Sequence, residues 1–370
     1  MATRRPNPNN SPNRRPNEMN RRRKKKKSKV GKIILFTIEI VALILVTMFL
    51  YSALKVERVG KVNIAEGSIV INEAVKEHAE VAMKGFRNVA LFGVDSTDGR
   101  LDKNTRTDTI MIASINLDNG EVRLVSVYRD TYLNLGNDRY NKANAAYAQG
   151  GPEQAINMLN MNLDLNIKDF VTVGFKGLVE TIDALGGIMI EVTDAELVHI
   201  NNYQQTMAKD LRRDFVPVQN TGLQKLDGMQ ATAYCRVRFT AGDDFRRAER
   251  NREVLKQILD EAKKASPATI NKIANEVFGS IYTSFDLADI VSILADITKY
   301  RIVDDGGFPE ASMRTTGTIG RAGSCVVPLD LEKNAIWLHE FLFAFEQYTP
   351  SADLKSYSEK IRSDTSQYLR

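Results

Sequence analysis

The 370-residue chain is predicted to form a layered α/β domain, with helices on both faces of a mixed central sheet, preceded by a single N-terminal transmembrane helix. Three observations lead to this prediction. A long apolar run follows a basic tail, strand-like and helix-like segments alternate over residues 86–300, and three consecutive strand-like segments are spaced as an antiparallel meander.

The first 32 residues form a basic tail that we expect to be disordered and cytoplasmic. They contain 13 Lys and Arg residues and one acid, Glu18. Since the whole chain carries a net charge of +5 and the tail carries +12, the remaining 338 residues carry −7. The basic pI therefore comes from the tail, and we expect no nucleic-acid partner for the folded part.

Residues 33–54 are predicted to cross the cell membrane once, as an uncleaved signal anchor. This run of 22 residues is apolar apart from Glu39 and a few Ser and Thr residues, and as a helix it would measure about 33 Å. Lys and Arg flank its N-terminal side, which places the N-terminus in the cytoplasm and everything after Leu54 outside. Glu39 either makes insertion of this helix into the membrane less favourable or lies close enough to the cytoplasmic face to stay hydrated.

The part expected outside the membrane divides into a stalk (55–85), a main domain (86–300) and a C-terminal appendage (301–370). Within the main domain the periodicity predicts strands over 88–94, 109–115, 122–127, 169–175 and 187–192, and helices over 152–164, 177–185 and 245–265. Two amphipathic helices are expected between Pro267 and Tyr300. The alternation of strands and helices is typical of a layered α/β domain.

Acids and arginines lie at the ends of the three strands of the predicted meander. Asp95 closes the first strand, Arg106 and Asp108 precede the second, and Arg129 and Asp130 follow the third. Antiparallel neighbours would bring all five to the same end of the sheet. Mg²⁺ takes one or two protein carboxylates and completes its shell with water and phosphate oxygens. We therefore expect Asp95 and Asp108 to hold Mg²⁺ against a diphosphate, although either acid alone could be a turn residue.

A second cluster of arginines occupies residues 234–251. Tyr234, Arg236 and Arg238 alternate with apolar residues, so we expect a strand over 234–239. Four polar residues then recur at or near helical spacing: Asp244, Arg247, Arg250 and Asn251. The planar guanidinium of arginine suits phosphate oxygens and stays charged in any environment. A solvated ion-pair network is the alternative interpretation of this cluster.

Several enzyme classes have no signature in the sequence. The histidines, His78, His199 and His339, are not spaced as zinc ligands, and each is expected on the surface. The chain has no G-x-S-x-G elbow and no P-loop. Cys235 and Cys325 do not form a C-x-x-C motif, and Cys235 would face the apolar side of its strand, so we favour buried thiols over a disulfide.

Short motifs between residues 86 and 260 occur in the order found in one known family. They are Leu91-Phe-Gly-Val-Asp-Ser, Arg106-Thr-Asp-Thr, Ser126-Val-Tyr-Arg-Asp-Thr, Asn141-Lys-Ala-Asn-Ala-Ala-Tyr, Val173-Gly-Phe-Lys-Gly-Leu, Asp183-Ala-Leu-Gly-Gly, Arg236-Val-Arg and the Asp244-to-Asn251 motif. With these motifs the chain resembles the LytR-CpsA-Psr family. The resemblance implies an extracellular enzyme of Gram-positive bacteria that transfers an anionic polymer, such as a teichoic acid or capsule, from a polyprenyl-pyrophosphate carrier to peptidoglycan.

The resemblance also implies roles for single residues. Asp95 and Asp108 would hold Mg²⁺, and the pyrophosphate would be contacted by Arg106, Arg129, Lys142, Arg236, Arg238, Arg247, Arg250 and Asn251. Asn251 stands where the family usually has Gln, which is longer by one methylene. The family's apolar cavity for the lipid tail would be lined here by Phe170, Val173, Phe175, Leu178, Val179 and Ile182, for which ordinary core packing is the commoner outcome.

The chemistry expected at such a site follows from charge. Attack of a sugar hydroxyl on phosphorus builds negative charge that Mg²⁺ and the arginines, Arg129 among them, would stabilise. Asp108 or Asp244 could accept the hydroxyl proton, and the sequence leaves both open. Two other functions share the same residues or topology: binding or hydrolysis of a polyprenyl pyrophosphate without transfer, and membrane-anchored regulation of the envelope.

Overall fold

The computed structural model describes residues 60–61, 64–79, 83–96, 101–102, 104–238, 240, 242–277, 280–345 and 347–368. The basic tail and the predicted anchor, residues 1–32 and 33–54, lie outside these ranges. Among the described residues, no helix is both long enough and apolar enough to span a bilayer.

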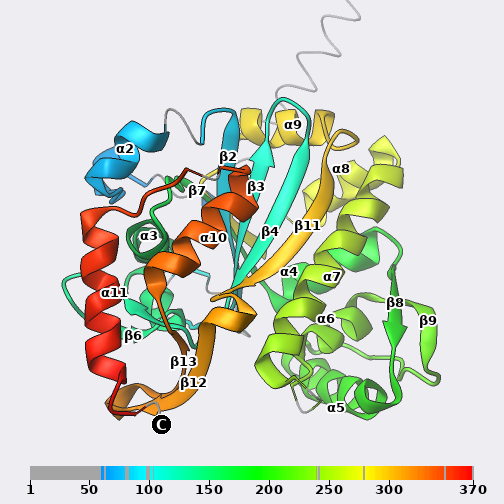
Figure 1. Cartoon of the computed structure of the whole chain (residues 1–370). Coiled ribbons are helices and arrows are strands. Elements are labelled where there is room, and N and C mark those ends of the chain that lie inside the picture. The colour runs from blue at the N-terminus through cyan, green and yellow to red at the C-terminus, as the bar shows by residue number, and fades with distance from the viewer. Residues whose placement is uncertain are drawn as a thin grey trace, which may run out of the picture. The chain divides into compact units, whose positions relative to one another are not determined.

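A mixed sheet of seven strands forms the centre of the described domain, in the order β1-β10-β7-β2-β3-β4-β11 (Figure 1). The strands are β1 Gly60–Lys61, β2 Phe86–Val94, β3 Thr107–Asn116, β4 Glu121–Val127, β7 Asp169–Gly174, β10 Ile281–Thr283 and β11 Arg301–Phe308. β2, β3 and β4 are antiparallel neighbours, which confirms the predicted meander. β7 pairs parallel with β2, and β11 pairs parallel with β4, so the sheet is mixed.

The tight turn between β3 and β4 sets the register of the meander. Asn116 accepts hydrogen bonds from the backbone N–H groups of Asp118 and Asn119 through its side-chain oxygen. Gly120 follows with a φ of +72°, and a Cβ at this position would collide with the carbonyl oxygen of Lys299. Glycine is therefore required here for both its backbone conformation and its lack of a side chain.

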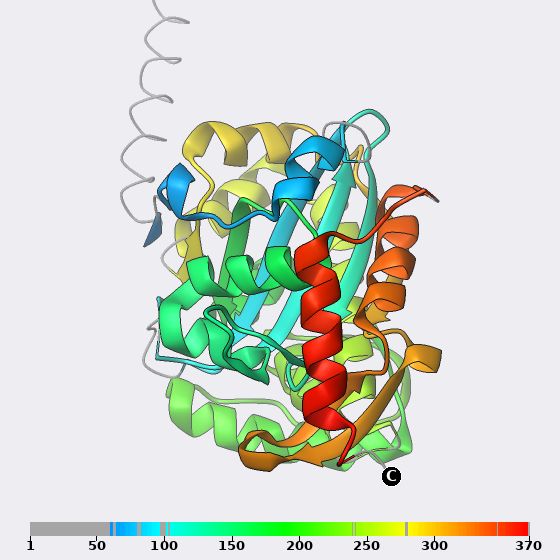
Figure 2. The same cartoon turned by 60° about the vertical axis from the view of Figure 1, so that its left-hand side comes forward.

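Helices cover both faces of the sheet, as expected for a layered α/β domain (Figures 1 and 2). One face carries α3 Asn144–Leu163 and α10 Leu331–Phe343, with α11 Ala352–Thr365 packed against both. The other face carries α4 Phe175–Ala184 and α7 Asp243–Lys264. The other α-helices of the described residues are α2 Glu73–Ala79, α5 Asp194–Leu211, α6 Gly228–Arg236, α8 Pro267–Glu276 and α9 Leu287–Ala295.

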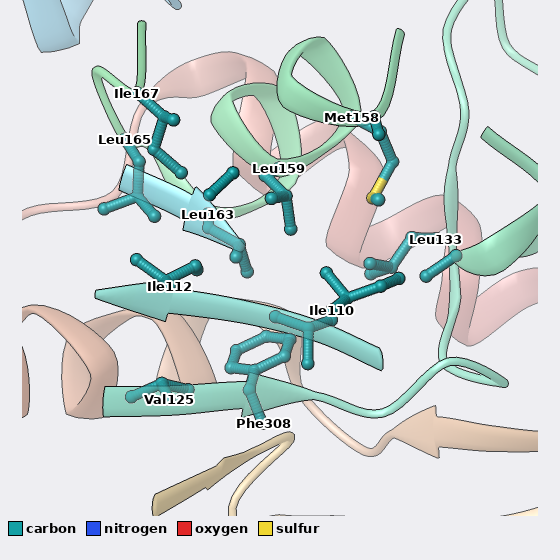
Figure 3. Close-up of a cluster of buried hydrophobic side chains, with 14 of the residues drawn as sticks. Ile110, Ile112, Val125, Leu133, Met158, Leu159, Leu163, Leu165, Ile167 and Phe308 are labelled. Carbon is teal, nitrogen blue, oxygen red and sulfur yellow. The ribbon is translucent and has the colours of Figure 1, made fainter. Parts of the chain in front are cut away.

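The largest apolar core lies between the sheet and α3. Figure 3 shows Ile110 and Ile112 of β3 facing Leu159 and Leu163 of α3, with Phe308 of β11 beside them. All five are almost fully buried, and removing such a side chain from water contributes about 1.5–3 kcal/mol. A separate core lies among α4, α5, α6 and the two-stranded sheet of β8 Ile188–Val192 and β9 Gly222–Leu226.

The described residues of the C-terminal segment, 301–345 and 347–368, contribute to the main core, although the sequence suggested an appendage. β11 completes the central sheet next to β4, and α10 and α11 contribute buried residues to the core shared with α3. Between them, β12 Arg314–Ile319 pairs with β13 Gly323–Pro328. The sequence of β11 is acidic and contains two glycines, which is not typical of a strand. This strand is stabilised by its pairing with β4 and not by its own composition. The expected stalk also contributes, since β1 pairs with β10.

A buried polar network ties three distant segments together. Asp164, at the end of α3, accepts hydrogen bonds from Asn72 Nδ2 (2.5 Å), the Ser351 N–H (2.7 Å) and the Tyr348 hydroxyl. His339 stacks on Tyr348, with ring centroids 3.6 Å apart, and is 1% exposed. The surface position expected for His339 is therefore wrong, because this face of α10 packs against α3.

Candidate active site

The predicted acids and arginines meet where β2, β3 and β4 end beside the first turns of α7. Asp95 follows β2, Asp108 is the second residue of β3, and Arg129 lies just beyond β4. The antiparallel pairing of these strands places all three at one end of the sheet, as predicted. Arg129 Nη1 donates a hydrogen bond to Asp108 Oδ1, so these two side chains are in direct contact at this end of the sheet.

Arg236 and Arg238 do not lie on a strand, which corrects the sequence prediction. Residues 228–236 form α6, with Arg236 as its last helical residue. The alternation at 234–239 was misleading because Tyr234 and Cys235 are both buried. A capping box marks the true start of the helix: Asp227 accepts from the Gln230 N–H, and the Gln230 side chain accepts from the Asp227 N–H.

Arg238 nevertheless joins the two predicted clusters. Its Nη2 lies 3.4 Å from Asp108 Oδ1, and its Nε lies 3.5 Å from Asp244 Oδ1. Arg247 contacts the same acids, with Nη1 3.3 Å from Asp244 Oδ1 and Nη2 donating to the Asp108 carbonyl at 3.3 Å. Arg236 Nη2 lies 3.9 Å from Asp95 Oδ2. The two clusters therefore form one site.

Several buried guanidinium nitrogens at this site make no hydrogen bond of normal geometry within the described part of the chain. They are Arg129 Nε, Arg236 Nη1, Arg247 Nε and Arg247 Nη1. Burial lowers the pKa of Arg247, and the nearby positive charge of Arg238 adds to this effect, while Asp244 and Asp108 oppose it. Arginine stays protonated even so. An anion at this position would fill the open donors and offset the buried positive charge.

Lys142 reaches the site through Asp130. It ends β6 Tyr140–Lys142, which pairs with β5 Tyr132–Asn134. Lys142 Nζ lies 3.2 Å from Asp130 Oδ1, and Arg129 Nε lies 3.5 Å from Asp130 Oδ2. Asp130 thus holds two of the predicted cations side by side.

The predicted pyrophosphate ligand Arg250 is not brought to the site, and the role of Arg106 stays a prediction. Arg250 is 1% exposed and donates to Glu196 Oε1 (2.7 Å), the Val237 carbonyl (2.9 Å) and Thr240 Oγ1 (2.6 Å). It faces Glu196 of α5, although it lies only three residues along α7 from Arg247. Arg106 is exposed directly before β3 and is not among the residues that line the cavity described next.

A cavity of about 430 Å³ opens at the arginine cluster and runs between the sheet and the helices α4 and α7. Polar residues line its mouth: Asp95, Asp108, Arg236, Arg238, Arg247 and Asn251. Its walls are apolar and include Leu91, Met111, Val171, Val173, Phe175, Leu178, Val254, Leu255, Ile258 and Ile281. The cavity therefore has a cationic end and an apolar interior.

The sequence identified only part of the cavity wall. Val173, Phe175 and Leu178 line it as expected, whereas Phe170, Val179 and Ile182 lie in the apolar cores. The wall formed by α7 was missed, although Asn251, Val254, Leu255 and Ile258 recur at helical spacing and indicate one stripe of the helix.

Two further contacts shape the mouth of the cavity. The guanidinium of Arg236 lies over the ring of Phe175, 4.3 Å from its centroid, and 5.3 Å from the ring centroid of Tyr203. Asn251 Nδ2 donates to Thr109 Oγ1 at 3.0 Å. The stacked Arg236 and the tethered Asn251 are thus held in fixed orientations where the charged and apolar parts of the cavity meet.

Asp95 and Asp108 suit a divalent cation. Burial raises the pKa of the Asp95 carboxyl; Arg236 opposes the rise, and the negative charge of Asp108 adds to it. A cation shared by the two acids would relieve this repulsion. No group of three or more His, Cys, Asp or Glu side chains is arranged around a metal position within the described ranges.

Both cysteines are buried free thiols, as the sequence favoured. Cys235 lies on α6 and not on a strand, and it contributes to the cavity wall. Burial raises the pKa of Cys235 to about 12 and that of Cys325 to about 11. Neither thiol is therefore set up as a nucleophile.

The chain is similar to named relatives over most of the described domain. It is 31% identical over 230 residues to the polyisoprenyl-teichoic acid–peptidoglycan teichoic acid transferase TagU of Enterococcus faecalis, covering 61% of this chain and 70% of that protein. The corresponding transferase TagT of Bacillus subtilis is 26% identical over 293 residues, covering 76% and 87%.

Solved structures support the same relationship. A crystal structure described as a transcriptional regulator from Enterococcus faecalis matches with a TM-score of 0.58 and 26% identity, covering 78% of this chain and 96% of that chain. The model of the LytR_cpsA_psr family matches residues 55–316, which is more than half of the sequence. The chain therefore belongs to the LytR_cpsA_psr family.

Proposed function

We propose that this protein transfers an anionic glycopolymer, of the teichoic acid or capsule type, from a polyprenyl-pyrophosphate carrier to peptidoglycan. The observation that carries the proposal is the cavity with apolar walls and an arginine-lined mouth. Such a cavity fits a ligand with a long apolar tail and a diphosphate head group. The names of the two transferases that the chain resembles support the same substrate class.

The diphosphate would be bound by Arg129, Arg236, Arg238 and Arg247. Their guanidiniums converge at the mouth, and four of their buried nitrogens make no hydrogen bond of normal geometry within the described residues. Two of these four, Arg129 Nε and Arg247 Nη1, lie within ion-pair distance of an acid. Hydrogen bonds to charged groups contribute roughly 1.5–3 kcal/mol each. Phosphate oxygens would also lie between the guanidiniums, which now share the carboxylates of Asp108 and Asp244. Lys142 adds positive charge through its contact with Asp130.

Asp95 and Asp108 would hold the Mg²⁺ ion. When bound, the ion would neutralise part of the diphosphate charge and so favour departure of the polyprenyl phosphate. Asp108 would keep its place through Arg129 and Arg238, which contact the same carboxylate. Asn251, tethered to Thr109, would fix the edge of the head-group site nearest the apolar cavity.

The reaction would be a displacement at the phosphorus that carries the polymer. A peptidoglycan hydroxyl oxygen forms the new bond to this phosphorus, the bond to the bridging oxygen breaks, and the polyprenyl phosphate leaves with the bonding electrons. The arginines stabilise the charge on the phosphoryl oxygens. Asp244 would accept the hydroxyl proton, because Asp108 is assigned to the metal pair and Asp244 is not; each of the two carboxylates lies near two arginines.

We also propose that the domain lies outside the cell, on a single-pass membrane anchor. The charge asymmetry around residues 33–54 supports this orientation. Protease added to intact protoplasts should remove the domain. Full protection of the domain would contradict both the orientation and the proposed access to peptidoglycan.

The function can be tested with the full-length chain in detergent. A labelled polyprenyl-pyrophosphate glycan and uncrosslinked peptidoglycan oligomers should yield a labelled peptidoglycan product in the presence of Mg²⁺. Asp244→Asn should abolish most of the transfer, whereas Asp304→Asn, a control at an exposed acid, should not. Release of free glycan with no labelled peptidoglycan would favour hydrolysis, and no turnover of the donor would favour a regulatory or binding role.

A further inference from the structure

A small cleft of about 20 Å³ adjoins the charged mouth of the apolar cavity. Asp108, Thr109, Arg247 and Asn251 line both spaces. From these shared residues the cavity extends toward β2 and β7, whereas the cleft extends toward β4 and β13. Since β3 lies between β2 and β4 in the sheet, the two spaces lead away from the mouth in opposite directions.

Two aromatic rings and an arginine form a cluster beside the cleft. Tyr128 lines it, and the ring of Phe245, next to Asp244 on α7, meets Tyr128 edge to face with centroids 4.6 Å apart. The guanidinium of Arg314 lies over both rings, 4.0 Å from the centroid of Phe245 and 4.7 Å from that of Tyr128. Phe245 and Arg314 are both half-buried, so part of each remains accessible.

The C-terminal segment holds this arrangement in place. Arg314 begins β12, and its Nη1 donates to the Tyr128 hydroxyl (3.0 Å) and to the Pro309 carbonyl (2.9 Å). Gly307 of β11 lies against the Tyr128 ring, and a Cβ there would collide with the Tyr128 hydroxyl. Val326 of β13 completes the floor of the cleft. The rings and the guanidinium are thus positioned before any ligand arrives.

We infer that the acceptor glycan binds across Tyr128, Phe245 and Arg314 beside this cleft, and that only its attacking hydroxyl enters the cleft, whose volume holds about one water-sized group. The inference rests on the proposed function. In a phosphoryl displacement the attacking and leaving oxygens lie roughly in line across the phosphorus. If the polyprenyl phosphate occupies the apolar cavity, the attacking hydroxyl enters from the opposite side, which is the side of the cleft.

The chemistry of this cluster of Tyr128, Phe245 and Arg314 suits a peptidoglycan chain. Aromatic rings pack against the C–H faces of sugars, and a guanidinium bonds to hydroxyl, amide and carboxylate oxygens. The side chain of Asp244 also lines the cleft, where it faces the incoming hydroxyl. The role of residues 301–328 is then to supply Arg314 and to seat Tyr128, in addition to completing the sheet.

Separate measurements of donor and acceptor binding test this inference with the full-length protein. Arg314→Ala and Phe245→Ala should each raise the KM for peptidoglycan oligomers on the order of tenfold, because each loses one contact worth about 1.4 kcal/mol. The Kd for a synthetic polyprenyl-pyrophosphate disaccharide should stay within about twofold of the wild-type value, since a twofold change is only about 0.4 kcal/mol. Arg314→Lys should restore only part of the acceptor affinity, because a point charge lacks the stacked plane.

Three outcomes distinguish the possibilities. Arg321→Ala is the matched control, because Arg321 is an exposed arginine of the same segment. A wild-type acceptor KM in both variants would overturn the inference while the proposed transfer stands. A weaker donor Kd in Arg314→Ala would assign Arg314 to the donor polymer instead. Absence of transfer by the wild-type protein would overturn the proposed function, and the acceptor site with it.

If Phe245→Ala does not fold normally, the variant Phe245→Leu can be used in its place, with a thermal melt to compare its stability with that of the wild type. Leucine keeps most of the buried apolar volume and removes the ring, so its melting temperature should stay close to that of the wild type. A raised acceptor KM in Phe245→Leu at matched stability would still support the inference. A normal KM in this folded variant would contradict the role of the ring.

Discussion

Replacing Arg250 with alanine is expected to destabilise the protein, although the sequence placed this residue among the pyrophosphate ligands. Its side chain is 1% exposed and holds three groups: Glu196 of α5 at 2.7 Å, the Val237 carbonyl at 2.9 Å and Thr240 Oγ1 at 2.6 Å. Glu196 is itself 2% exposed. Removing the guanidinium would take one hydrogen-bond donor from the buried Glu196 carboxylate. It would also remove the side-chain donor to the Val237 carbonyl.

The expected loss follows from the nature of the pair. Removing one member of a buried ion pair lowers the free energy of unfolding by about 3–5 kcal/mol. A surface pair on the same helix provides the comparison: Arg246 and Glu249 lie 2.9 Å apart with side chains 39% and 49% exposed. Such pairs contribute roughly 0–1 kcal/mol. Arg246→Ala should therefore have little effect.

The pH dependence of unfolding gives the pair a second signature. Burial raises the pKa of Glu196, but hydrogen bonds from Thr193 and Arg250 outweigh this effect, so the net pKa is lowered. A lowered folded-state pKa stabilises the protein above the ordinary Glu pKa, and this contribution disappears as the pH falls through the folded pKa. Arg250→Ala should show less of this acid-dependent loss than the wild type.

Urea unfolding followed by circular dichroism, at neutral pH and at a series of acidic values, measures both effects. Binding of a polyprenyl-pyrophosphate disaccharide should be tested at a temperature where the variant is folded. Unchanged stability combined with a large loss of donor affinity would refute the reasoning and return Arg250 to the pyrophosphate site.

Three further predictions concern the site itself. Arg238→Ala should weaken donor binding about ten- to a hundredfold, as expected for the loss of one or two charge-assisted bonds, whereas the exposed Arg362→Ala should not; equal effects in an affinity titration would contradict the assignment. Chelation of Mg²⁺ should weaken donor binding in the wild type but not in Asp108→Ala, and metal-independent binding by the wild type would show that the acids are structural. Cys235 and Cys325, with pKa values of about 12 and 11, should resist iodoacetamide at pH 8 until the protein is unfolded, and rapid native labelling seen by mass spectrometry would contradict their burial.

The sequence was most informative where local signals and long-range geometry agreed. The Asp118-Asn-Gly turn and the alternation of the neighbouring strands predict the meander, and the meander alone brings Asp95, Asp108 and Arg129 together. Helical spacing likewise places Asp244 and Arg247 on one side of α7. In both cases the position of the side chain follows from local periodicity, within one helix or within strands that are neighbours in the sequence.

Other features depend on contacts that periodicity does not contain. Arg247 and Arg250 are three residues apart on the same helix, yet one faces the sheet and the other faces Glu196 on α5. Only the placement of α5 separates their roles. The helix over 228–236 was misread as a strand because polar and apolar residues alternate over 234–239, although the Asp227 capping box was available as a signal.

The pairing of β11 with β4 also has a consequence for how the chain folds. β4 ends at Val127, two residues before Arg129, and its outer edge is unpaired until Arg301–Phe308 has been synthesised and has docked. A contact between segments so distant in the sequence closes late and slows folding. Until then the chain exposes a strand edge that favours aggregation. An expression fragment that ends at residue 300 would keep that edge permanently open, and one that ends at 316, where the family match stops, would divide β12.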